Sequence, residues 1–267
     1  MSLLDIKAVV SDMDGVLWRG QTLLPGMVDF FTFLRGQNMP FVLATNNSGR
    51  HPEDYIQKLA DMGVADIETW QIVTSGTATV DYLTQHYPHG ARLYVIGNLG
   101  LFHILEEADF TIIREENINI EESVDAVVAG IDFDFTYQKA RTATLLIRNH
   151  GAAFIGTNPD VTFPSPAGLV PGAGSVIGMI QHATDVEPTI IGKPKRAMFD
   201  VALQRLGTKA SETLMLGDRL STDIEGGHAA GLRTAMLLTG VSRREDISNI
   251  QPDYIFKNLP ALMKAWC

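Results

Sequence analysis

The sequence predicts an α/β protein whose parallel sheet is interrupted by a second, smaller α/β domain. Short β-branched apolar runs alternate with longer amphipathic stretches at both ends of the chain, which is typical of parallel α/β sheets. The middle repeats this alternation as a block of its own after the turn-forming residues 88–90. A chain of 267 residues suits one large domain or two modest ones. We therefore predict a core of residues 1–87 and 187–267, and an inserted domain at 88–186.

The two chain ends supply the elements of the predicted core. Its strands are short apolar runs, and its helices repeat apolar residues at helical spacing before glycine stops them. In chain order we expect strand 6–10, helix 27–34, strand 41–44, helix 52–62, strand 189–191, helix 197–206, strand 214–216, helix 223–230 and strand 234–238.

The middle segment carries enough elements for a small domain of its own. Here we expect strand 93–97, helix 99–108, strand 126–129, helix 137–149 and strand 153–155. The chain would return to the core near Pro188.

The composition limits the classes of binding partner that we expect for this protein. The formal net charge is −10, so the protein as a whole has no attraction for nucleic-acid phosphate or anionic lipid. Cys267 is the single cysteine and cannot form an intramolecular disulfide. No apolar run approaches the ~20 residues that span a bilayer, and the first residues do not resemble a signal peptide. We expect a cytoplasmic protein that binds neither nucleic acid nor membrane.

Two carboxylates follow the first predicted strand. Asp12 and Asp14 are spaced by two, which places both side chains on one face of an extended chain. The ends of parallel strands form the ligand crevice of open α/β sheets, and Gly15 permits a turn. An ordinary surface turn is the alternative, but the apolar run directly upstream disfavours it.

Three further polar groups follow other predicted strands of the core. Thr45, Asn46 and Asn47 can donate to phosphate oxygens, although capping and turn formation explain such residues equally well. Lys193 stands between a glycine and a proline, which favours charge neutralisation over an ordinary surface role. Asp218 and Asp223 offer the carboxylate oxygens that Mg²⁺ prefers, and Asp223 could also stabilise a helix N-terminus.

Taken together and in this order, these four motifs resemble the haloacid dehalogenase superfamily of phosphatases, in its NagD-like, 4-nitrophenylphosphatase branch. The resemblance runs from the first strand to about Leu259, and residues 157–160 and 171–175 resemble the end of that family's cap. It implies a doubly wound, Rossmann-like core with an α/β cap inserted between the second and third motifs.

The resemblance also implies a mechanism and a cofactor. Asp12 would attack phosphorus and form an aspartyl-phosphate, while Asp14 would protonate the leaving group and then activate water. Mg²⁺ would be held by Asp12, the Asp14 backbone carbonyl and Asp218, with Asp223 bound directly or through water. Lys193 and Thr45 would stabilise charge on the phosphoryl oxygens.

The substrate of such an enzyme is a small phosphate monoester, for instance a sugar phosphate, a nucleoside monophosphate or 4-nitrophenyl phosphate. Asn158, Asp160 and Phe163 are the expected specificity residues of the cap, and the outer face of the cap could pair two subunits as a homodimer. A phospho-aspartate signalling module and a catalytically weak phosphometabolite-binding protein are the alternatives. A receiver module needs no cap, and the intact Asp12 and Lys193 disfavour a weak binder.

Two other features fit ordinary structural roles. Asp132 and Asp134 form a second Asp-x-Asp pair, but Asp134 and Thr136 are expected to cap the following helix. The three tryptophans are scattered, and packing is the role we expect for Trp18.

Overall fold

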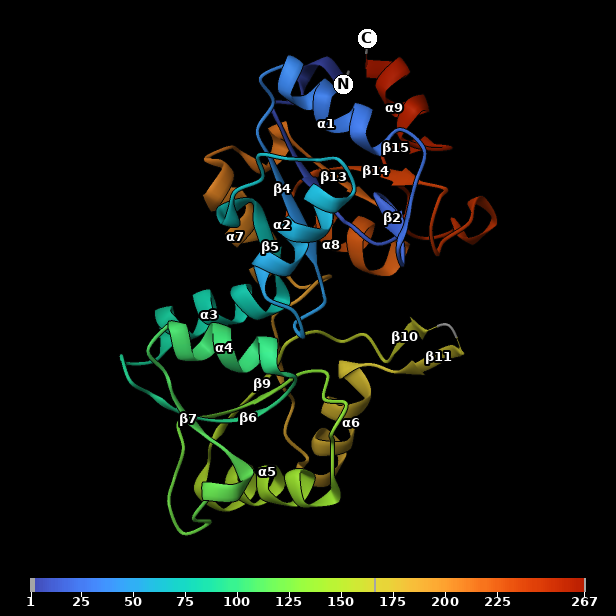
Figure 1. Ribbon diagram of the computed structural model, residues 1–267. Helices are drawn as coiled ribbons and strands as arrows, with labels where there is room; N and C mark the ends of the chain where they lie inside the picture. Colours follow the sequence, from blue (N-terminus) through green and yellow to red (C-terminus); the bar gives the residue numbers. More distant parts are fainter. Residues whose placement is uncertain (1–2, 166, 267) are drawn as a thin grey trace. The chain divides into compact units, whose positions relative to one another are not determined.

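The computed structural model describes residues 3–165 and 167–266, and Figure 1 shows its ribbon. Cys267 lies outside the described residues, as do the first two positions of the N-terminus. The chain forms two compact units. The core unit comprises Met1–Thr45, Pro52–Val73 and Lys193–Cys267, and the inserted unit comprises Asn46–His51 and Thr74–Gly192.

The core unit is built on a six-stranded sheet in the order β15-β14-β13-β1-β4-β5. Its strands are β1 (Ala8–Ser11), β4 (Phe41–Thr45), β5 (Ile72–Thr74), β13 (Thr213–Gly217), β14 (Arg233–Leu237) and β15 (Tyr254–Phe256). Strand β1 pairs in parallel with both β13 and β4. The chain builds one side of the sheet outward from β1 before it returns to build the other, so the strand order reverses between β1 and β13. That reversal is the switch point of a doubly wound sheet.

Helices cover both faces of this sheet. They are α1 (Met27–Gly36), α2 (Pro52–Asp61), α7 (Arg196–Leu206), α8 (Glu225–Ala229) and α9 (Leu259–Trp266). Leu214 and Leu216 point into the core shared with α1, α2 and α9. Met215, between them, faces α8, because a Cβ on Gly227 would lie 3.1 Å from it. A two-stranded hairpin, β2 (Trp18–Arg19) with β3 (Thr22–Leu23), follows β1.

The inserted unit has a parallel five-stranded sheet in the order β12-β9-β8-β6-β7. These strands are β6 (Arg92–Ile96), β7 (Thr111–Ile113), β8 (Ala126–Ala129), β9 (Ala153–Gly156) and β12 (Thr189–Ile190). A separate antiparallel hairpin consists of β10 (Thr162–Ser165) and β11 (Gly168–Pro171).

Helices also cover this second sheet on both faces (Figure 1). They are α3 (Ser75–His86), α4 (Leu99–Glu107), α5 (Tyr137–His150) and α6 (Ala173–Thr184). Leu146 of α5 and Ile177 of α6 share a core with Val127 of β8. In Figure 1, α3 and α4 lie on the opposite side of the sheet.

The structure differs from the sequence-based expectations in two places. Strand β12, which we expected in the core sheet, pairs with β9 of the inserted unit. Helix α3, where the sequence predicted no element, belongs to the inserted unit. The helix expected at 223–230 is a π-helical turn, Leu220–Ile224, followed by α8. In the described part of the chain, no helix combines the length and apolar character needed to cross a bilayer.

Candidate active site

The register of the core sheet brings three of the predicted motifs to one edge. Ser11, the last residue of β1, pairs with Leu216 of β13 and with Leu43 of β4. Asp12 therefore emerges beside the end of β13, which Asp218 follows at once. Thr45, buried, is the last residue of β4. This edge contains the switch point, where doubly wound sheets bind ligands.

Lys193 joins this edge from the return segment of the chain. Its ammonium lies 2.5 Å from Asp12 Oδ1 and 2.8 Å from Asp223 Oδ1. It also donates to the carbonyl oxygen of Ala44, 3.0 Å away. The residue is only 2% exposed. A buried ammonium in contact with two carboxylates stays charged, and these contacts raise its pKa although burial opposes the charge.

Three carboxylates gather at this edge of the sheet, and two of them contact the lysine. Oxygen atoms of Asp12, Asp218 and Asp223 all lie within 4.8 Å of one another. Burial raises the pKa of Asp12 well above its ordinary value, and repulsion from the other two carboxylates adds to this effect while Lys193 opposes it. Burial, with repulsion from Asp223, likewise raises the pKa of Asp218 to about 6. One ammonium among three carboxylates leaves the cluster short of positive charge.

The donor set of this cluster fits a hard divalent cation. Carboxylate oxygens are the ligands that Mg²⁺ prefers. Asp223 Oδ1 is buried and, among the described residues, has no directed hydrogen-bond donor although Lys193 lies close. Its other oxygen accepts from the backbone N–H groups of Asp218 and Arg219, 3.2 and 3.1 Å away. Asp223 thus orders the loop after β13 and still offers an oxygen to the cluster.

The loop after β14, residues 239–242, holds Asp218 in place, a role that we did not predict from the sequence. Val241 N–H donates to Asp218 Oδ2 at 2.6 Å, and Thr239 Oγ1 donates to the carbonyl of Gly15 at 2.6 Å. A Cβ on Gly240 would lie 1.7 Å from Asp218 Oδ2, so only glycine permits this approach. A Thr-Gly pair one residue beyond a buried strand was the available signal.

Asp14 lies exposed at the start of the turn that follows β1. Gly15, at φ 87°, makes this turn, and a Cβ there would lie 2.5 Å from Asp218 Oδ2. The indole Nε1 of Trp18 donates to Asp14 Oδ1 at 2.9 Å. Trp18 is fully buried, which agrees with the packing role that we expected for it. Its indole also contacts Asp14, a predicted catalytic carboxylate.

Asn46, Asn158 and Asp160 form one network inside the inserted unit. The Asn46 amide donates to Asp160 Oδ2 at 3.1 Å, and the Asn158 amide donates to the Asn46 backbone carbonyl at 2.7 Å. Asn158 is buried, and its own carbonyl oxygen accepts from the Asp160 backbone N–H. Bonds of this kind order the segment at 46–49 against the segment after β9.

The remaining predicted residues of the inserted unit have local contacts. Asn47 Oδ1 accepts from the Gly49 N–H, a turn-forming contact. The ring of Phe163 lies 5.9 Å from that of Phe133, in a tilted arrangement. The second Asp-x-Asp pair is structural: Thr136 caps α5 through the Lys139 N–H, and Asp132 pairs with the Lys139 ammonium at 2.8 Å.

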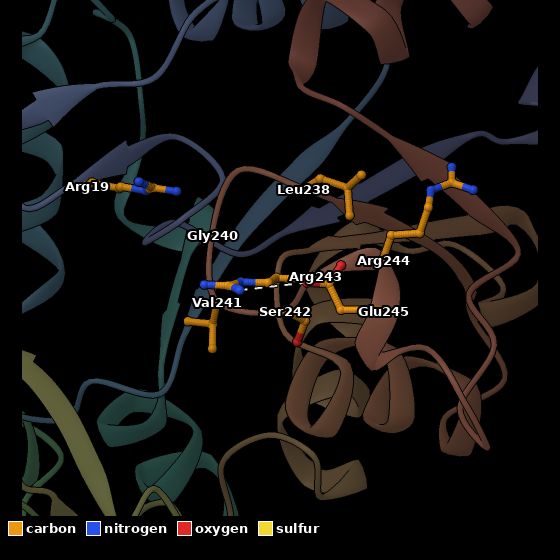
Figure 2. A pocket seen from close by; sticks show the side chains of 8 residues that line it. All are labelled: Arg19, Leu238, Gly240, Val241, Ser242, Arg243, Arg244 and Glu245. Atoms are coloured by element: carbon orange, nitrogen blue, oxygen red, sulfur yellow. Dashed lines mark ion pairs between the residues drawn. The ribbon is translucent and has the colours of Figure 1, made fainter.

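Figure 2 shows a hollow of about 550 Å³ on the core unit, beside the loop after β14. Its lining residues are Arg19, Leu238, Gly240, Val241, Ser242, Arg243, Arg244 and Glu245. Arg19 donates to the Thr239 carbonyl, and Arg243 pairs with Glu245 at 3.7 Å. None of the predicted site residues lines this hollow, so its importance lies in the loop that supports Asp218.

Comparison with known proteins identifies the family of the chain. The model of the haloacid dehalogenase-like hydrolases matches residues 9–111, and a second HAD-hydrolase-like model matches residues 190–262. The chain is 40% identical over 255 residues to the acid sugar phosphatase of Staphylococcus aureus. This match covers 95% of each of the two chains.

Several solved structures with this fold have phosphatase names. The 4-nitrophenylphosphatase of Thermotoga maritima matches with a TM-score of 0.91 at 35% identity and full coverage of both chains. NagD of E. coli matches with a TM-score of 0.85 at 32% identity, covering 97% of each chain. A glycerol phosphate phosphatase of Mycobacterium tuberculosis, solved with magnesium, matches with a TM-score of 0.87 at 29% identity, over all of this chain and 78% of that one. The chain therefore belongs to the haloacid dehalogenase-like hydrolases, in the NagD-like branch of phosphatases.

Proposed function

We propose that this protein is a Mg²⁺-dependent phosphatase that hydrolyses phosphate monoesters of small metabolites through an aspartyl-phosphate on Asp12. One observation carries the proposal: oxygens of Asp12, Asp218 and Asp223 lie within 4.8 Å of one another, and the Lys193 ammonium contacts two of these carboxylates. That arrangement combines a nucleophile, an oxygen-ligand set and a fixed positive charge at the switch point of the sheet.

In the first step, an Asp12 oxygen attacks phosphorus as the bond from phosphorus to the ester oxygen breaks. Asp14 donates a proton to the departing oxygen, which leaves as an alcohol. Lys193 already contacts Asp12, and its positive charge favours the ionised form of that carboxylate. The Lys193 ammonium and the Thr45 hydroxyl would stabilise charge on the transferring phosphoryl oxygens.

In the second step, water attacks the phosphorus of the aspartyl-phosphate. The Asp14 carboxylate, now deprotonated, takes a proton from this water, and the bond between phosphorus and the Asp12 oxygen breaks. Inorganic phosphate and the original carboxylate result, so both aspartates return to their starting states. Asn46 and Asn47 are proposed to donate further hydrogen bonds to phosphate.

Mg²⁺ would be held by Asp12, Asp218, Asp223 and the Asp14 backbone carbonyl. When bound, it supplies positive charge that offsets repulsion between the nucleophile and the phosphate dianion. The raised pKa values of Asp12 and Asp218 support this assignment, because burial and then repulsion among the carboxylates disfavour their ionised forms, which a bound cation would stabilise.

Residues 88–186, which lie within the inserted unit, are proposed to act as the cap. Within it, Asn158, Asp160 and Phe163 would select the substrate. The names of the relatives support sugar phosphates and 4-nitrophenyl phosphate as substrates, and nucleoside monophosphates extend the same class. We also propose a cytoplasmic location and a homodimer formed through the cap.

Phosphate release from 4-nitrophenyl phosphate tests this proposal. We expect activity with Mg²⁺, loss of activity with chelator, and restoration when Mg²⁺ is added back. Asp12→Asn should abolish turnover, and brief incubation of the wild type with labelled substrate should leave acid-stable, hydroxylamine-sensitive label on Asp12. Turnover that persists in Asp12→Asn, or in chelator, would refute the mechanism. Binding without turnover would indicate a phosphometabolite-binding protein instead.

A further inference from the structure

The turn after β1 holds an indole against the predicted acid–base residue. Trp18 Nε1 donates to Asp14 Oδ1 at 2.9 Å. The two residues are four positions apart and form an isolated parallel bridge, in which the Gly15 N–H donates to the Trp18 carbonyl at 2.7 Å. The bond between their side chains is therefore built on a backbone that is itself closed into a tight loop.

Trp18 is held from several sides. Its side chain is fully buried, and its backbone pairs with Leu23 in the hairpin of β2 and β3. The Lys58 ammonium lies 4.0 Å from the centre of the indole ring and donates to the Gly20 carbonyl of the same hairpin. Packing of this kind fixes the ring, so the indole N–H can point in one direction only.

Asp14 differs from its tryptophan partner, because it is exposed. An exposed aspartate changes rotamer freely unless a bond restrains it. The fixed indole N–H supplies such a restraint at Oδ1. General acid–base catalysis depends on the carboxyl group being within hydrogen-bond reach of the proton it moves. A group that fixes the carboxyl therefore contributes to the rate without touching the substrate.

We propose that Trp18 is a positioning residue for proton transfer, which orients the Asp14 carboxyl toward the leaving-group oxygen. The inference rests on the proposed function and adds a residue to that mechanism. When the bond from phosphorus to the ester oxygen breaks, the proton moves from Asp14 to that oxygen. Without the indole N–H, Asp14 keeps its chemistry but is less often in the correct orientation.

Leaving groups that need a proton to different extents test this role. An alkyl phosphate, such as glycerol 3-phosphate, releases a strongly basic alkoxide and depends on the acid, whereas 4-nitrophenyl phosphate releases a stable phenolate. The quantity kcat/KM reports the first irreversible step, which includes leaving-group departure. We expect Trp18→Phe to lower kcat/KM for the alkyl ester at least about 10-fold more than kcat/KM for the nitrophenyl ester. This loss is part of the rate acceleration of about 10²- to 10⁴-fold that general acid–base catalysis contributes.

A matched control exists on the same unit. Trp70 Nε1 donates to Glu68 Oε2 at 3.0 Å at an exposed position, so Trp70→Phe removes the same kind of bond away from the site. It should leave the ratio between the two substrates unchanged. Trp18 can also be replaced by 3-benzothienylalanine, which preserves the shape of the ring and lacks only the N–H. This replacement should reproduce the effect of Trp18→Phe. It provides the test if the phenylalanine variant folds poorly.

A double-mutant cycle completes the test. Asp14→Asn should itself depress the alkyl ester selectively, and Trp18→Phe added to it should change the ratio less than about two-fold, because the indole acts through Asp14. Equal loss for both substrates in Trp18→Phe, no change in the benzothienyl variant, or a further selective loss in the double variant would each overturn the inference. An inactive wild type would instead refute the proposed function.

Discussion

The ammonium of Lys193 lies 2.5 Å from Asp12 Oδ1, although 181 positions separate the two residues in the chain. The lysine also contacts Asp223, so a single side chain compensates two buried carboxylates. Both carboxylates and the ammonium are almost inaccessible to water. Removal of the lysine therefore leaves buried negative charge rather than a simple gap.

Lys193→Met should consequently destabilise the metal-free protein as well as abolish catalysis. Loss of one partner of a buried ion pair costs about 3–5 kcal/mol, and protonation of the carboxylates will recover part of this. We expect kcat to fall at least about 100-fold, since the charge on the transferring phosphoryl group loses its fixed cation. Urea unfolding in chelator at pH 7, with steady-state kinetics, measures both effects.

The control for this variant is Lys7→Met, which removes an exposed ion pair with Glu212 at 2.6 Å on the same unit. Water screens that pair, so neither kcat nor the unfolding midpoint should change appreciably. If Lys193→Met were no less stable than Lys7→Met, the buried ion pairs of Lys193 would not stabilise the folded protein.

Gly240→Ala should weaken Mg²⁺ binding. The added Cβ would lie 1.7 Å from Asp218 Oδ2, so the carboxylate or the loop must move. We expect at least about a 10-fold rise in the dissociation constant of Mg²⁺, with an overpacking cost of about 1–3 kcal/mol. Titration calorimetry with Mg²⁺ alone tests the first effect. Gly36→Ala, at a helical position with no atom within 4 Å of the new Cβ, should bind Mg²⁺ as the wild type does.

The hydroxyl of Thr239 gives a finer test of the same loop, because it donates to the Gly15 carbonyl at 2.6 Å. Thr239→Val preserves shape and removes that bond, which typically contributes about 0.5–1.5 kcal/mol. Mg²⁺ affinity should fall about 2- to 10-fold, and Thr239→Ser should restore it. Failure of serine to restore affinity would point to the methyl group instead.

The free energy of unfolding of the metal-free protein should fall as pH rises through the range in which Asp218 titrates. The pKa of Asp218 is raised to about 6, above its ordinary 3.8, so between these values the folded state holds a proton that the unfolded chain has released. The unfolding free energy then decreases with rising pH until about pH 6. Protons also compete with Mg²⁺, whose apparent affinity should rise over the same interval and level off above it.

Urea unfolding of chelator-treated protein from pH 4.5 to 7.5 measures this dependence. Asp218→Asn lacks the titrating group, so the difference in stability between wild type and variant should change across pH 4–6 and then stay constant. Parallel curves for the two proteins would show that Asp218 does not titrate there.

Much of the core could be predicted because its signals are local. Three of the predicted motifs follow short apolar strands of the core sheet, and parallel strands bring their ends together whatever lies between them in sequence. Asp12 and Asp218 meet for this reason, whereas Lys193 joins them from the segment after β12, a strand of the other sheet. The family of the chain follows from the same motifs and is confirmed.

Other features depend on packing that a linear pattern does not encode. Residues 189–190 are apolar enough for either sheet, and only tertiary contacts assign β12 to β9. Thr239 and Gly240 resemble any turn until the carboxylate of Asp218 lies against them. The direction of the Trp18 N–H depends on Lys58 and on the hairpin, neither of which the spacing of residues reveals.

The pairing of β1 with β13 has a consequence for synthesis on the ribosome. A nascent chain that has emerged only as far as residue 190 contains β1 and its neighbour β4, but not β13, the strand that pairs with β1 on its other side. The inserted unit, in contrast, is continuous from Thr74 to Gly192 apart from one short segment. Domains fold as units during translation, so this middle part can become ordered while β1 still lacks its second neighbour. The acidic cluster would then be among the last features of the molecule to form.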